Sequence, residues 1–183
     1  MAKADLRIGN IELSVDREAG VFGPLYLDDT CIVYRIAAAL RDAAWGTPMP
    51  IVRLVRERNT NRKNNGITEA HYTFDLDYRS TGDDLSAALE VHIADSHVSC
   101  SFRSVAERPF VKNRFGLCLL LPATLAGEAF SVGHPGGDHT VGSFPISISP
   151  DQPALDVSAL TFHAGRHCRS EERRVGKECA TGC

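Results

Sequence analysis

Residues 69–78 read Glu-Ala-His-Tyr-Thr-Phe-Asp-Leu-Asp-Tyr, and this stretch decides the fold class. Apolar and aromatic residues occupy every second position, with polar residues between them. Successive side chains of a β-strand point to opposite faces, so the alternation predicts a strand with one face in a core and the other in solvent. The side chains predicted to face the core are those of Ala70, Tyr72, Phe74, Leu76 and Tyr78.

The same alternation continues along the chain after short polar turns. Residues 87–93 and 98–102 alternate in the same way, and turn-forming residues lie at 80–84 and 95–96. Three consecutive strands with short connections form an antiparallel meander. Further short strands are expected at residues 6–8, 11–15, 24–27, 130–132, 141–148 and 154–162. The chain is therefore predicted to be all-β, an antiparallel β-sandwich with meander strands and little helix.

Three segments depart from the alternating pattern. Residues 115–121, Phe-Gly-Leu-Cys-Leu-Leu-Leu, form a continuous apolar run, which predicts a strand covered on both faces in the middle of a sandwich. Residues 34–45 are rich in alanine and fit a helix by propensity. The strands around them and the following Gly-Thr-Pro at 46–48 favour an extended segment instead. Residues 56–66 are almost entirely polar and predict a hairpin loop or a mobile insertion.

The bulk composition limits the classes of partner. The 183 residues include 20 lysines and arginines and 23 acidic residues, a net charge of −3. A mildly acidic chain without a basic stripe argues against nucleic acid and against an anionic membrane surface as partners. The amino-terminal residues contain no apolar signal core, and no apolar run reaches membrane-spanning length, which favours a cytoplasmic protein. Cys31, Cys100 and Cys118 lack C-x-x-C spacing and are expected to be small buried apolar residues.

The segment at residues 169–179 reads Arg-Ser-Glu-Glu-Arg-Arg-Val-Gly-Lys-Glu-Cys. A DNA that encodes it without a gap resembles a widely used short-read sequencing adapter. This resemblance favours a non-native tail over an ordinary charged, solvated one. Leaving the segment out removes four basic and three acidic residues and changes the net charge to −4. We therefore predict an amino-terminal β-sandwich domain of a longer protein over residues 1–165, followed by a disordered, adapter-derived tail over residues 166–183.

Polar groups with the spacing of a known site are few. Residues 134–139, His-Pro-Gly-Gly-Asp-His, place two histidines and a carboxylate in a glycine-rich turn. A metal site needs further ligands and supporting hydrogen bonds, and Pro-Gly-Gly-Asp is already a sufficient turn signal, so no metal and no cofactor are predicted. His71, His92 and His97 fall at solvent-facing or turn positions, where exposure explains them. The sequence contains no nucleophile elbow and no nucleotide-binding glycine loop, and catalytic residues stay unassigned.

Several short motifs follow one another in an order that resembles one known family. Residues 41–47 read Arg-Asp-Ala-Ala-Trp-Gly-Thr, and residues 113–116 read Asn-Arg-Phe-Gly. Phe-Pro at 144–145 and Ile-Ser-Pro-Asp-Gln-Pro at 148–153 come later. In order and spacing these motifs resemble the amino-terminal domain of the D-apionate lactonases. That resemblance implies a β-sandwich followed by a larger barrel-type domain and a further β domain.

The resemblance also implies a function for the parent protein. It would be a lactonase, a carboxylic ester hydrolase that opens a branched sugar-acid lactone in carbohydrate catabolism. Loops of a barrel carry the chemistry in barrel enzymes, so this fragment alone is expected to be inactive. Its expected partners are the missing carboxyl-terminal domains of the same chain and the small sugar-acid lactone. The residues expected to contact the substrate or those domains are Asn113, Arg114, His134, Asp151 and Gln152.

Two other classes of function stay open. A non-catalytic carbohydrate-binding or glycosidase-accessory module would carry aromatic side chains on an exposed face. Tyr72, Phe74 and Tyr78 are its candidates, although the alternation turns them toward the core. A plain scaffold domain would only dock against its neighbour. Loops of Asn113–Arg114 and His134 that converge on one concave end would favour the lactonase over the scaffold.

Overall fold

A computed structural model of the protein describes residues 4–62, 66–79, 84–94, 96–147, 156–164 and 167–172. The chain divides into two compact units, residues 1–121 and residues 122–183. Within the described residues the regular structure consists of β-strands and one short 3-10 turn, η2 (Ala123–Leu125). The prediction of an all-β chain with little helix is confirmed. Over the same residues, no helix has the length and apolar character needed to cross a membrane.

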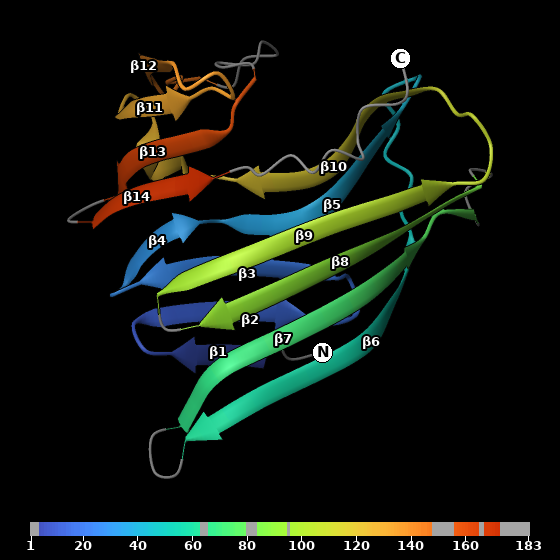
Figure 1. Ribbon diagram of the computed structural model, residues 1–183, viewed down its shortest axis with the longest axis horizontal. Helices are drawn as coiled ribbons and strands as arrows, with labels where there is room; N and C mark the ends of the chain where they lie inside the picture. Colours follow the sequence, from blue (N-terminus) through green and yellow to red (C-terminus); the bar gives the residue numbers. More distant parts are fainter. Residues whose placement is uncertain are drawn as a thin grey trace. The chain divides into compact units, whose positions relative to one another are not determined.

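One sheet of the first unit is a four-stranded antiparallel meander (Figure 1). Its strands follow one another in space in chain order, and the central strands are β7 and β8. The register places Phe74 opposite Leu89 and Leu89 opposite Phe102, so the predicted apolar positions lie on one face. The predicted meander is confirmed. The four strands are β6 (Ile51–Arg62), β7 (Gly66–Asp77), β8 (Leu85–Ala94) and β9 (His97–Ala106).

The other sheet of this unit joins the start of the chain to a strand that follows the meander. Its order is β1-β2-β3-β5-β10, and β4 pairs with β3 off this path. Residues 35–42 form β5, which confirms the extended interpretation of the alanine-rich segment. The strands are β1 (Ala4–Ile8), β2 (Ile11–Asp16), β3 (Val21–Leu27), β4 (Thr30–Val33), β5 (Arg35–Asp42) and β10 (Lys112–Leu120).

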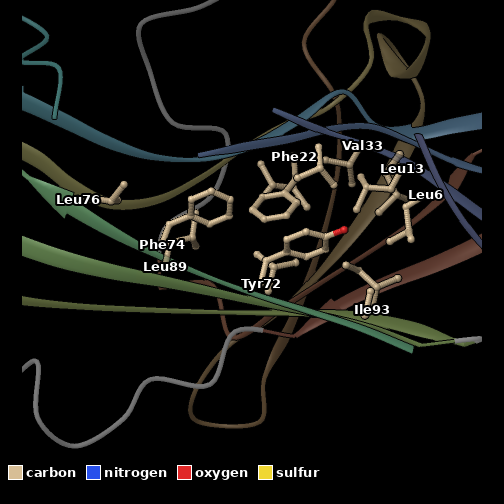
Figure 2. Packing of buried hydrophobic residues seen from close by; sticks show 14 of the residues in the cluster. Leu6, Leu13, Phe22, Val33, Tyr72, Phe74, Leu76, Leu89 and Ile93 are labelled. Atoms are coloured by element: carbon tan, nitrogen blue, oxygen red, sulfur yellow. The ribbon is translucent and has the colours of Figure 1, made fainter. Parts of the chain in front are cut away.

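The two sheets of the first unit face each other across one apolar core (Figure 2). Phe22 of β3 packs edge-on against Tyr72 and Phe74 of β7, with ring centroids 5.5 and 5.6 Å apart. Leu13, Phe22, Phe74 and Leu89 are fully buried. Edge-to-face aromatic pairs add about 0.5–1.5 kcal/mol each to the burial of their area. The core is therefore the interior of the predicted sandwich, and its sheets do not close into a barrel.

The prediction of a polar loop or insertion at residues 56–66 is wrong in extent. Strand β6 runs to Arg62 and β7 begins at Gly66, and Arg56, Glu57 and Arg58 pair with residues of β7. Because β6 is the end strand of its sheet, its backbone is paired on one side. Val52 and Leu54 pack against the core, whereas residues 55–61 are exposed. Charged side chains at such a position protect an edge from pairing with other chains. Residues 63–65 lie outside the described part of the chain.

A charged pair links the two sheets at this edge. The Arg17 guanidinium donates to both carboxylate oxygens of Glu57, with distances of 2.8 and 2.5 Å, and lies 5.7 Å from the Tyr72 ring centroid. The hydrogen bonds from Arg17 hold the pKa of Glu57 below its usual value. Arg17 follows β2 and Glu57 belongs to β6, so the pair spans the two layers.

The prediction that residues 115–121 form a strand covered on both faces is also wrong. Strand β10 ends the order of its sheet. Phe115 and Leu117 pack against the core, whereas Leu119 and Leu120 are 37% and 46% exposed. A run of apolar residues does not distinguish a central strand from an end strand whose outer side chains stay in solvent.

The second unit contains a four-stranded sheet of order β12-β11-β13-β14. Phe130, Val132 and Phe162 are buried in it, and the Phe144 ring lies 4.8 Å from Phe130 and 5.7 Å from Phe162. Strands were expected at 141–148 and 154–162. Residues 144–147 and 156–158 are not in strands, and residues 148–155 lie outside the described part of the chain. The strands are β11 (Ala129–Gly133), β12 (His139–Ser143), β13 (Ala159–Ala164) and β14 (His167–Glu172).

Strand β14 falls in the segment predicted to be a tail. Residues 167–172 pair with β13 along its whole length. Residues 173–183 lie outside the described part of the chain. The domain boundary at residue 165 and the origin of the segment that follows it stay predictions.

Candidate functional site

A tight turn after β5 presents the tryptophan of the first family-like motif. The Asp42 carboxylate accepts hydrogen bonds at Oδ1 from the backbone N–H of Ala44 at 2.9 Å and of Gly46 at 2.7 Å. The Trp45 N–H donates to the Asp42 carbonyl at 3.1 Å. Trp45 has a φ of 63°, a left-handed conformation that costs a non-glycine residue about 1–2 kcal/mol. The turn thus holds Trp45 in a strained position with its side chain 61% exposed.

The second motif supports this turn from β10. The Asn113 side-chain amide donates to the carbonyl of Asp42 at 2.8 Å and to that of Ala43 at 3.1 Å. Arg114 lies with its guanidinium carbon 5.8 Å from the Trp45 ring centroid, within range of a cation–π interaction. The register between β10 and β5 shifts between Lys112 and Arg114, so Asn113 sits at a bulge. A bulge redirects a side chain, which explains how Asn113 reaches the turn.

We call Asp42, Trp45, Asn113 and Arg114 the Trp45 platform. Two sequence-predicted site residues, Asn113 and Arg114, belong to it. Segments some 70 positions apart in the chain meet here. Exposed apolar side chains flank the platform in sequence, with Met49 66% and Val111 78% exposed. The platform thus presents an exposed indole and an arginine on a hydrogen-bonded turn.

The other predicted site residues lie in the second unit. Both ring nitrogens of His134 have partners: Nδ1 lies 3.0 Å from the Asp156 carbonyl oxygen and Nε2 lies 3.0 Å from the Thr140 hydroxyl. A carbonyl only accepts, so Nδ1 carries the proton and a neutral ring accepts from Thr140 at Nε2. His134 therefore ties together the loops on either side of β12. Asp151 and Gln152 lie outside the described residues, and their expected contacts stay predictions.

A cluster that sequence reasoning missed lies on the solvent side of the meander. The Nε2 atoms of His71 and His92 lie 3.3 and 2.6 Å from the same Glu69 oxygen, Oε1. The two imidazole rings stack, with centroids 4.0 Å apart and planes at 8°. Hydrogen bonds from His92, and then from His71, lower the pKa of Glu69. His71 and His92 are directly opposed in the β7–β8 register. The polarity pattern places both side chains on the solvent face but does not say which residues pair across the two strands.

The three cysteines and the core tyrosines differ in burial. Cys31, Cys100 and Cys118 are half-buried and form no disulfide, so they are less buried than expected. Tyr72 and Tyr78 are buried in the core, as the alternation predicts. Burial raises the pKa of Tyr78 to about 12. These aromatic side chains form no exposed platform for a sugar ring.

The described residues form an all-β chain of antiparallel sheets. In its first unit two sheets face each other, and an ordered turn at the end of β5 holds the exposed Trp45. A family model described as D-apionate lactonase, N-terminal domain, matches residues 1–177. The chain belongs to this family.

One curated relative is D-apionate lactonase from Brucella anthropi. It is 28% identical to this chain over 169 residues, which cover 90% of this chain and 26% of the relative. The chain thus spans about a quarter of the length of that relative. No solved structure matches the chain.

Proposed function

We propose that this chain is the amino-terminal domain of a cytoplasmic lactonase that opens a branched sugar-acid lactone, of the D-apionate type, in carbohydrate catabolism. Family membership over residues 1–177 and the printed activity of the Brucella anthropi relative support this proposal. The match covers only 26% of that relative. The reacting groups then belong to the rest of the parent protein.

The role proposed for this domain is to dock against those other domains. The Trp45 platform is the observation that carries it, since a strained, hydrogen-bonded turn holds an indole 61% exposed. The platform is built from residues of two of the family-like motifs, those at 41–47 and 113–116. Fixing an apolar anchor before binding reduces the entropy lost on association. A well-packed aromatic or arginine anchor is also the usual centre of a protein interface.

Two of the residues expected to contact substrate or other domains, Asn113 and His134, already have partners within this chain. Opening a lactone requires a water molecule, a base to activate it and donors that stabilise the oxyanion. The Asn113 amide donates to two backbone carbonyls, and both His134 nitrogens are hydrogen-bonded. These contacts hold loops, and a substrate would have to displace them.

Hydrolysis of D-apionate lactone by two purified proteins tests the proposal. One is the full-length protein that contains this chain, and the other is the 183-residue chain alone. We expect turnover by the full-length protein and none by the chain. Turnover by the chain would place the reacting groups here, and no turnover by the full-length protein would remove the lactonase assignment.

The alternative, a carbohydrate-binding module, is favoured by one observation. Trp45 and Tyr34 are exposed, at 61% and 59%, and exposed aromatic rings are able to stack on a sugar. The tyrosines and phenylalanine first suggested for that role are buried. Titration of the chain with D-apionate and with neutral oligosaccharides, followed by Trp45 fluorescence, separates the two functions. Saturable binding of an oligosaccharide would favour the module.

A further inference from the structure

The outer face of the meander carries three donor groups that converge on one point. They are Nε2 of His71, Nε2 of His92 and a carboxylate oxygen of Glu69, and all three lie within 4.8 Å of one another. Two imidazoles and one carboxylate form a ligand set for Zn²⁺, Ni²⁺, Co²⁺ or Cu²⁺. Nothing in the proposed docking role of the Trp45 platform uses these residues.

The backbone holds the three groups at fixed positions. Glu69 and His71 lie two residues apart on β7, so their side chains share one face. His92 is directly opposite His71 on β8. Both strands are central in the sheet and are paired on each side. Ligands mounted on such strands are positioned more precisely than ligands mounted on loops.

The distances approach those of a metal-bound set. Donor atoms around a tetrahedral ion with bonds of about 2.0–2.1 Å stand about 3.3 Å apart. The separation between His71 Nε2 and Glu69 Oε1 is 3.3 Å, and that between His92 Nε2 and Glu69 Oε1 is 2.6 Å. The two rings are stacked with their planes at 8°, so they have to rotate about their side-chain bonds before both nitrogens point at one ion.

The charged neighbours set the conditions for binding. Arg58 pairs with His71 in the register, and Arg56, Arg58 and Glu90 line the same shallow hollow. The His97 ring stands edge-on to His92, with centroids 5.5 Å apart. The two arginines oppose a cation, whereas the Glu69 and Glu90 carboxylates attract one. An ion binds an imidazole nitrogen that carries no proton, so binding displaces any proton held at Nε2 of His71 or His92.

We propose that Glu69, His71 and His92 form a binding site for one divalent transition-metal ion, with imidazole and carboxylate ligands from this chain and water at the remaining positions. The ion replaces the shared Glu69 hydrogen bonds with bonds to itself and releases any proton held between the three groups. Coordination joins β7 to β8 through their side chains, so it stabilises the meander in addition to its backbone ladder.

Calorimetric titration of the 183-residue chain with NiCl₂ and with ZnCl₂ at about pH 7.5 tests the site. We expect one ion per chain, and binding at least about tenfold weaker in His92→Ala and in Glu69→Gln. His139→Ala is the matched control, because His139 is an exposed histidine outside the cluster, and it should bind as the unmodified chain does. The six cysteines of the sequence also attract these ions, so the variants decide where an ion is bound.

A second readout is independent of the titration and of folding defects in a variant. Nitrogen-detected NMR spectra of the imidazoles in the unmodified chain should show the His71 and His92 resonances shifting together on addition of Zn²⁺. Binding that both cluster variants leave unchanged, the absence of saturable binding, or unshifted His71 and His92 resonances would each overturn the proposal.

Discussion

Replacing Asp42 by alanine tests the structural basis of the Trp45 platform. The substitution removes the acceptor of two backbone hydrogen bonds, from the N–H groups of Ala44 at 2.9 Å and Gly46 at 2.7 Å. The turn that holds Trp45 in its left-handed conformation, with a φ of 63°, would then lose two of the contacts that offset the strain. We expect the turn to open and the indole to become mobile.

The magnitude follows from the two lost bonds. A hydrogen bond contributes a net 0.5–1.5 kcal/mol or so, and more when one partner is charged. Asp42 is only half-buried, so about 1 kcal/mol per bond is appropriate, or about 2 kcal/mol for Asp42→Ala. Both bonds use the same oxygen, Oδ1, which an asparagine amide also supplies. Asp42→Asn should therefore lose less than about 1 kcal/mol.

Urea unfolding measures the free energy of both variants, and fluorescence anisotropy reports on the turn. Trp45 is the single tryptophan of the sequence, so its signal needs no assignment. We expect lower stability and lower indole anisotropy in Asp42→Ala, with Asp42→Asn close to the unmodified chain. Equal stability of all three proteins, or an unchanged anisotropy in Asp42→Ala, would refute the role assigned to the carboxylate.

Three further predictions concern the core, the edge strand and pH. Phe74→Ala should lower the free energy of unfolding by about 3–5 kcal/mol in urea titrations, because the ring is fully buried against Phe22; a loss below 1 kcal/mol or so would contradict that packing. Leu89→Asp should prevent folding, as judged by circular dichroism, because it buries an unpaired charge. Leu119→Asp should change the melting temperature little, because Leu119 is 37% exposed. If Leu119→Asp prevented folding as Leu89→Asp does, Leu119 would be buried and β10 would lie in the middle of the sandwich. The pKa of Tyr78 is near 10 in the unfolded chain and about 12 in the folded one. The free energy of unfolding should therefore fall as pH rises from about 10 to 12, and Tyr78→Phe should reduce that fall. Denaturation series at pH 9 and 11 measure the difference.

The fold class was predictable because one physical signal dominates this sequence. Alternation at residues 69–78 places Tyr72, Phe74 and Leu76 in the core, and the structure buries all three. Burial of one face is the main constraint on a half-exposed strand, so period-two patterning is reliable there. The same signal is absent from the polar residues 56–62 of β6 and from the apolar run of β10, both in end strands of their sheets. Polar β6 and apolar β10 were therefore misinterpreted, as a loop and as a central strand.

The platform and the histidine cluster depend on pairing between distant segments. Asn113 reaches Asp42 only because a bulge in β10 turns it toward the end of β5, and bulges are not visible in a pattern of polarity. His71 and His92 were recognised as solvent-facing, but the β7–β8 register that opposes them was not known. The sequence thus identified Asn113 and Arg114 of the platform as site residues and missed the histidine cluster, whose geometry depends on strand pairing.

The most direct test of the account is whether the Trp45 platform packs against the rest of the parent protein. Labelling the chain with 5-fluorotryptophan places one fluorine probe at Trp45, the single tryptophan in the sequence. Adding the separately produced remainder of the full-length protein should shift the fluorine NMR resonance to a saturating limit, and Trp45→Ala should weaken association in gel filtration. A complex that leaves the resonance unchanged, or two parts that do not associate, would contradict the docking role.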